Sequence, residues 1–113
     1  MNYFRVFLKN PVSEKLFLYS INPQEAFRID PEFSRYFICK PEEVDLLLPG
    51  EYFFVQTKHI LADNNELIEL ACELQKEALW NRYKLTDKLF LRKLTEDNNS
   101  VTQLWRPILV SDN

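Results

Sequence analysis

The stretch from residue 49 to residue 57 constrains the fold more than any other part of the sequence. It begins with Pro49 and Gly50, and Gly50 is the only glycine in the chain. Pro-Gly fits the two central positions of a type II turn, the second of which requires positive φ. The following residues, 51–57, read EYFFVQT and place apolar side chains on both alternating faces. The sequence therefore predicts a sharp turn followed by an interior strand that is covered on both sides.

Two apolar runs and three prolines precede this turn. Residues 3–9 (YFRVFLK) alternate with period two, and residues 16–21 (LFLYSI) are apolar enough for a strand that is buried on both faces. These two strands are candidates for a hairpin. The pairs Asn22–Pro23 and Asp30–Pro31 each place a capping residue before a proline at a first helical position, which predicts one or two short helices within 22–37. Residues 40–48 (KPEEVDLLL) are predicted to form a loop or a single turn.

A long amphipathic helix and a hairpin are predicted after the central strand. Asp63 and Glu66 match a capping box, and apolar residues then recur at three-and-four spacing, so the helix is expected from about 63 to 83. Residues 86–94 and 101–110 are predicted to be strands joined through the turn formers EDNNS, and Pro107 implies an edge position or the end of the ladder. The order predicts an α+β fold, in which a mostly antiparallel sheet of about five strands packs against the long helix and the short ones. Residues 1–113 are expected to form a single domain.

Charge and glycine content exclude several classes of function. The net charge is −3 and the basic residues are scattered, whereas nucleic-acid binding needs a concentrated positive surface. One glycine is too few for the loops that hold nucleotide phosphates. No run approaches the roughly 18 apolar residues of a membrane span, and the first residues do not resemble a signal peptide. We therefore expect a cytoplasmic protein without direct nucleic-acid or membrane partners.

Few residues could support catalysis or metal binding. The chain has one histidine, His59, and two cysteines, Cys39 and Cys72, with no metal-ligand spacing among them. The cysteines are interpreted as buried free thiols, although one disulfide or one reactive thiol is an alternative. Acid pairs such as Glu69 and Glu73 fit a solvated helix face. Catalysis by a cysteine with His59 is a lesser hypothesis, so no enzyme activity, metal or cofactor is predicted.

Aromatic residues make up 14% of the chain and provide the best candidates for a binding site. We predict that Tyr52, Phe54, Trp80 and Trp105 line it, although the two tryptophans also fit the core edge or a partner contact. The first functional hypothesis is therefore a non-catalytic domain that binds a small hydrophobic or cationic aromatic ligand. The alternative is a protein-interaction or accessory domain, either with another protein or as a homo-oligomer, in which exposed aromatics and an edge strand at 101–110 form the contact.

Part of the sequence resembles a known family. Pro49 and Tyr52, the helix from Asp63 and the closing element at Pro107 are similar, over about residues 35–110, to the second half of the gyrase-inhibitor-like effector-binding domains. Those domains occur alone and on bacterial multidrug-responsive transcription activators. The resemblance implies two strand-helix-strand-strand repeats with a cleft between them for flat or cationic hydrophobic molecules. It also implies that Tyr52 is a pocket residue.

Overall fold

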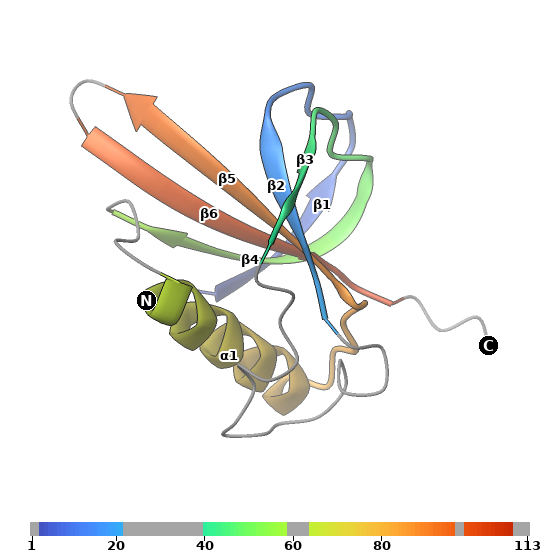
Figure 1. Ribbon diagram of the computed structural model, residues 1–113. Coiled ribbons are helices and arrows are strands. Elements are labelled where there is room, and N and C mark those ends of the chain that lie inside the picture. Colours follow the sequence, from blue (N-terminus) through green and yellow to red (C-terminus); the bar gives the residue numbers. More distant parts are fainter. Residues whose placement is uncertain (1–2, 22–39, 59–63, 97–98, 110–113) are drawn as a thin grey trace.

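A computed structural model describes residues 3–21, 40–58, 64–96 and 99–109 (Figure 1). Six strands form one antiparallel sheet in the order β1-β4-β6-β5-β2-β3, and one helix lies across a face of it. The elements, in chain order, are β1 (Tyr3–Leu8), β2 (Leu16–Ser20), β3 (Glu42–Val44), β4 (Gly50–Thr57), α1 (Asn64–Trp80), β5 (Lys88–Glu96) and β6 (Asn99–Pro107). The predicted α+β class is confirmed, with one strand more than expected. The short helices predicted within 22–37 fall outside the described residues.

One prediction about strand pairing is wrong, one is confirmed, and one strand was not predicted. β1 and β2 do not form a hairpin, because β1 pairs with β4 while β2 pairs with β5 and β3. β3 itself lies within residues 40–48, which were predicted to be a loop or a turn. The hairpin of β5 and β6 is confirmed.

The last strand is central rather than at an edge. β6 lies between β4 and β5, so it cannot supply the edge contact predicted at 101–110. Pro107 is the final residue of β6, opposite Tyr52, where the missing N–H of proline falls at the end of the ladder. The two edges of the sheet are β1 and β3.

β4 is the interior strand that its sequence predicts. It pairs with β1 on one side and β6 on the other, and both of its faces are covered. Gly50 has the expected positive φ, but its value is 153°, whereas the third residue of a type II turn has a φ of about 80°. Gly50 begins β4 and pairs with Leu8, so it enters the strand directly instead of closing a tight turn.

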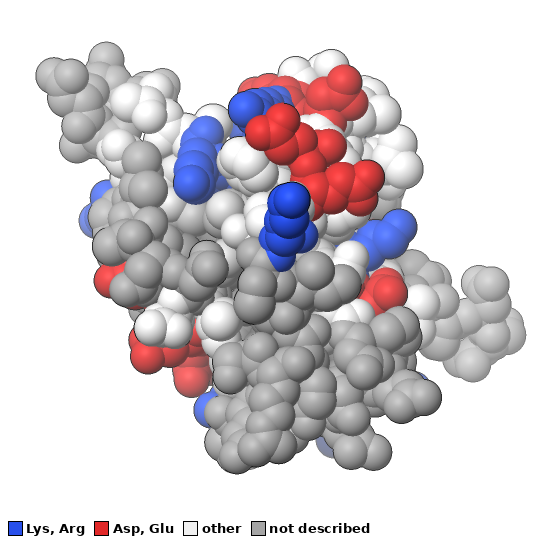
Figure 2. Space-filling model, viewed as in Figure 1, with Lys and Arg blue, Asp and Glu red and all other residues white. Residues whose placement is uncertain are grey.

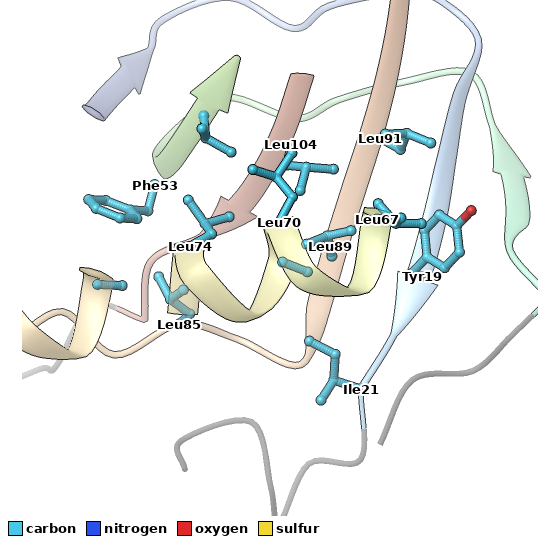
Figure 3. Packing of buried hydrophobic residues seen from close by; sticks show 13 residues of the cluster. Tyr19, Ile21, Phe53, Leu67, Leu70, Leu74, Leu85, Leu89, Leu91 and Leu104 are labelled. Atoms are coloured by element: carbon cyan, nitrogen blue, oxygen red, sulfur yellow. The ribbon is translucent and has the colours of Figure 1, made fainter. Parts of the chain in front are cut away.

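One face of the sheet packs against α1 to form the main core. Leu67, Leu70 and Leu74 point from the helix toward Leu89 and Leu104 of the sheet (Figure 3). Each of these five side chains is at most 5% exposed. Their three-and-four spacing places them on one side of the helix, which is why the sequence pattern identified this helix correctly. α1 is too short and too polar to cross a membrane, and no other helix occurs in the described part of the chain.

The C-terminal cap of α1 orients the segment that follows it. The backbone N–H of Tyr83 donates to the carbonyl of Ala78 at 2.8 Å, and the N–H of Arg82 donates to that of Leu79 at 3.0 Å. This is the hydrogen-bond pattern of a Schellman motif, in which the residue at the Arg82 position takes a left-handed conformation. Arg82 has a φ of 65°. The helix therefore ends at Trp80, before the predicted residue 83, and Tyr83 is turned back toward the sheet.

The opposite face of the sheet forms a second core because the sheet curls over it. Val12 and Leu47 form an isolated bridge that joins the segment after β1 to the segment after β3. Leu16 and Leu47 are fully buried there against Tyr52 and Trp105. We call this opposite side, which carries no described helix, the second face.

Candidate functional site

Three of the four predicted ligand-lining residues meet on the second face. The ring of Trp105 lies 4.5 Å from that of Phe54 and 5.7 Å from that of Tyr52, measured between centroids. Tyr52 is 4% exposed and Trp105 7% exposed. The hydroxyl of Tyr52 donates to the carbonyl of Leu48 at 2.5 Å. These rings therefore fill the second core and pack against each other.

A polar network borders these rings across three strands. Gln103 accepts a hydrogen bond from the indole N–H of Trp105 at 3.2 Å and donates one to Gln56 at 2.8 Å. Its neighbour Arg92 forms two hydrogen bonds with the carboxylate of Glu14, at 2.8 and 2.5 Å. The network orients Trp105 and ties the segment before β2 to β5. Acidic side chains gather over β2 and β3 in Figure 2, with basic ones placed singly around them.

The fourth predicted residue, Trp80, lies apart from the other three. It is the last residue of α1 and is 84% exposed. Because α1 covers the main core, Trp80 lies on the other side of the sheet from Tyr52 and Trp105. The structure therefore does not bring the four predicted residues into one site.

A groove of about 400 Å³ lies between β1 and the C-terminal end of α1. It is lined by Tyr3, Phe4, Arg5, Phe53, Glu77, Asn81 and Tyr83. Three aromatic rings form its wall. The rings of Tyr3 and Phe53 are stacked, with centroids 6.3 Å apart and planes 7° apart, and the ring of Tyr83 lies 5.6 Å from that of Phe53. The groove depends on the helix cap, since the cap turns Tyr83 toward Phe53.

The groove combines aromatic faces with charge of both signs. The guanidinium carbon of Arg5 lies 5.5 Å above the centroid of the Tyr83 ring, and its Nη2 lies 2.7 Å from a carboxylate oxygen of Glu51. On the other side, burial and the charges of Glu73 and Glu77 raise the pKa of the Tyr3 hydroxyl. Tyr3 therefore lies partly buried within reach of two acidic side chains of α1, while the guanidinium of Arg5 lies over Tyr83.

Comparison with protein-family models, curated proteins and solved structures found no match.

The order of elements bears on the family resemblance. β4, α1, β5 and β6 follow one another as strand, helix, strand and strand. β1 is followed by β2, with no helix in the described residues that join them. Tyr52, the pocket residue that the resemblance implies, lies in the second core.

The residues considered for catalysis are only partly placed. Cys39 and His59 lie outside the described residues. Cys72 is a half-buried thiol that packs against the main core. Among the residues that the structure describes, no three His, Cys, Asp or Glu side chains cluster closely enough to hold a metal ion.

The groove was not predicted, partly because Phe53 alternates along β4 with Tyr52 and Phe54, the residues that were predicted to line the site. Phe53 lies between Tyr52 and Phe54 in β4 and points to the opposite face, toward α1. Tyr83 follows the helix cap, and Tyr3 belongs to a strand whose pairing with β4 the sequence pattern does not reveal. The recognisable signal was the concentration of aromatic residues on both faces of the β1 and β4 sequences.

Proposed function

We propose that this protein is a non-catalytic binding domain whose site is the groove between β1 and α1, and that its ligand is a small molecule with a cationic group attached to an aromatic or aliphatic body. The observation that carries the proposal is the meeting of three aromatic rings with Glu77 in one groove. Aromatic rings attract cations through their negative faces, and a carboxylate adds direct attraction.

The position of Arg5 supports this ligand chemistry. Its guanidinium lies over Tyr83 within the distance of a favourable cation–π contact, roughly 6 Å from the centroid. The same ring could hold the cation of a ligand if Arg5 moved toward Glu51, with which it already pairs. Arg5 is exposed on the surface, so this movement requires no disruption of the core.

The size of the groove also supports a small ligand. Its volume of about 400 Å³ falls in the range of roughly 300–1,000 Å³ that is typical of small-molecule sites. Arg5, Glu77 and Asn81, the charged and amide side chains of the lining, would orient a ligand whose apolar part lies against Tyr3 and Phe53. No residue in this arrangement is placed to act as a nucleophile with an adjacent base, which supports binding rather than catalysis.

Two probes of opposite charge test the proposal. Benzyltrimethylammonium and benzylsulfonate share an aromatic group, and we expect only the cation to bind, as measured by isothermal titration calorimetry and by a rise in the melting temperature. Glu77→Gln should weaken binding of the cation by roughly threefold, whereas Glu69→Gln, an exposed change on the same helix, should leave it unaltered. Equal binding of both probes, or equal effects of both variants, would contradict the proposal.

Two further variants test the roles of the rings and of Arg5. Tyr83→Phe keeps the ring and should preserve binding, whereas Tyr83→Leu should weaken it by roughly two- to fivefold. Arg5→Met removes the internal cation from the groove and should tighten binding. The urea midpoint of each variant shows whether the fold is intact.

A further inference from the structure

β1 is an edge strand without the features that usually prevent edge-to-edge association. It is six residues long, and no described strand pairs with its outer side. Phe4 and Phe7 are 51% and 63% exposed. Natural edge strands are commonly guarded by outward charges, proline, a bulge or short length. The one charge within β1, on Arg5, is directed over the sheet toward Glu51 and Tyr83.

The other edge of the sheet provides an internal comparison. β3 has only three residues, and two of them are the exposed glutamates Glu42 and Glu43. It therefore carries both short length and charge, which are common protections of an edge. Among the strands that the structure describes, β1 is therefore the edge that lacks these protections.

We infer that β1 pairs with β1 of a second copy of this chain, antiparallel about a two-fold axis at Val6, so that the two sheets become one. Residues directly opposite each other in antiparallel strands point to the same face. With Val6 opposite Val6 of the second copy, Arg5 comes opposite Phe7, and Phe4 opposite Leu8. Each of these contacts occurs twice, as a two-fold interface requires.

Pairing of the two β1 strands gives contacts to their exposed phenylalanine rings and hydrogen bonds to the backbone groups of their outer edges. Phe7 comes opposite Arg5 of the second copy, whose aliphatic stem covers the ring while its guanidinium keeps its contacts with Glu51 and Tyr83. Phe4 packs against an aliphatic side chain, and the unpaired backbone groups of both strands form hydrogen bonds. By contrast, a register with Arg5 opposite Arg5 would place like charges together, which is unfavourable.

Charge complementarity at the ends of the strand favours the same register. The exposed Lys9 follows β1 directly and comes opposite Tyr3 of the second copy. That position is on the side of the sheet where the charges of Glu73 and Glu77 act on Tyr3. The ammonium group of Lys9 therefore approaches an acidic surface. This inference rests on the strand edge, and its Lys9 contact reaches Tyr3, which also lines the groove.

Sedimentation and light scattering of the full chain over a wide concentration range test the inference. We expect the mass to double as the concentration rises. Phe7→Lys places a like charge opposite Arg5 twice and should weaken the dimer at least tenfold, whereas Phe7→Leu should change it far less. Since Phe7 is 63% exposed, both variants should keep the wild-type fold, which circular dichroism would verify. A wild-type chain that stays monomeric, or a Phe7→Lys variant that dimerises as well as wild type, would overturn the inference.

Cysteine trapping tests the register itself. Val6→Cys places two thiols opposite each other at the axis, within the range of a disulfide. In Phe7→Cys the two Cα atoms would be about 8 Å apart, beyond the limit of about 7 Å for a disulfide. Mild oxidation should therefore link Val6→Cys rapidly and Phe7→Cys poorly, although position 7 is the more exposed, and peptide mapping would identify the linked residues. Faster linking through position 7 would overturn the register.

Discussion

Replacing Gln75 with leucine should destabilise the protein far more when Arg106 is present than when it is absent. Arg106 is completely buried between β6 and α1. Its Nη1 donates to Oε1 of Gln75 at 2.5 Å, its Nη2 donates to the carbonyl of Thr86, and its Nε has no partner among the described residues. Burial lowers the pKa of Arg106 to about 9, while the charge of Asp87 raises it. Arg106 is therefore still a cation at neutral pH.

The expected magnitudes follow from the number of acceptors around this cation. Hydrogen bonds to charged groups contribute about 1.5–3 kcal/mol each. Gln75→Leu removes the side-chain acceptor of Nη1 of the buried guanidinium. We therefore expect the free energy of unfolding to fall by about 2–3 kcal/mol. Arg106→Met loses the hydrogen bonds of the guanidinium but also removes the cost of burying its charge. Because these two effects oppose each other, stability should stay within about 1 kcal/mol of wild type.

The double variant distinguishes the charge from simple packing. Once Arg106 is methionine, Gln75→Leu no longer deprives a buried cation of an acceptor, and its cost should fall by about 2 kcal/mol. The coupling energy is then about 2 kcal/mol or more. Urea unfolding of the four proteins, with unchanged m-values, measures it.

A second buried glutamine serves as the control. Gln103 lies on the second face of the sheet and contacts Trp105 and Gln56, so the effect of Gln103→Leu should be additive with that of Arg106→Met to within about 0.5 kcal/mol. If Gln75→Leu costs the same with and without Arg106, the reasoning about the buried cation is refuted.

Three other predictions concern the helix cap, the start of β4 and the groove. Arg82→Gly should stabilise the fold by about 1 kcal/mol in urea unfolding, because glycine takes the left-handed conformation of the helix cap without steric cost; Arg82→Ala should give no such gain. Gly50→Ala should destabilise it by about 1 kcal/mol or more through its φ of 153° alone, since nothing lies within 4 Å of the added Cβ. The raised pKa of Tyr3 means that its stabilising contribution is present below the unfolded-state value of about 10 and is lost as pH rises through the folded-state value. Tyr3→Phe should therefore lose less stability than wild type in urea titrations above about pH 10, and an identical loss would contradict the raised pKa that burial and the two glutamates give Tyr3.

Local patterns predicted the elements that carry strong periodicity. The two apolar faces of residues 51–57 identified an interior strand, and the spacing of Leu67, Leu70 and Leu74 identified α1, because both patterns depend only on neighbouring residues. The end of the helix was missed because Arg82 occupies a position where glycine is the usual signal. β3 was missed because a three-residue strand with two glutamates carries no apolar alternation.

Pairing partners were harder to predict than elements. Alternation reveals which side chains share a face of a strand but not which strand lies beside it, so nothing local indicated that β1 pairs with β4. The meeting of Tyr52, Phe54 and Trp105 depends on the β4–β6 pairing, which the sequence pattern did not predict, and Trp80 lies apart from them. The groove depends on the pairing of β1 with β4 and on the turn at Tyr83, and neither is visible in the local sequence.

The central place of β6 has a consequence for how the chain assembles during synthesis. Among the described strands, only β5 and β6 are joined by a short hairpin, while β1 and β2 each find a sheet neighbour far along the chain. Sheets with such non-local pairings form slowly, because a strand that is synthesised early cannot pair until its partner strand has been synthesised. β4 and β5 both lie against β6, which is synthesised after the other described strands. β1, by contrast, can pair with β4 before β6 is synthesised, while its outer edge stays without a partner among the described strands and open to a second copy of the chain.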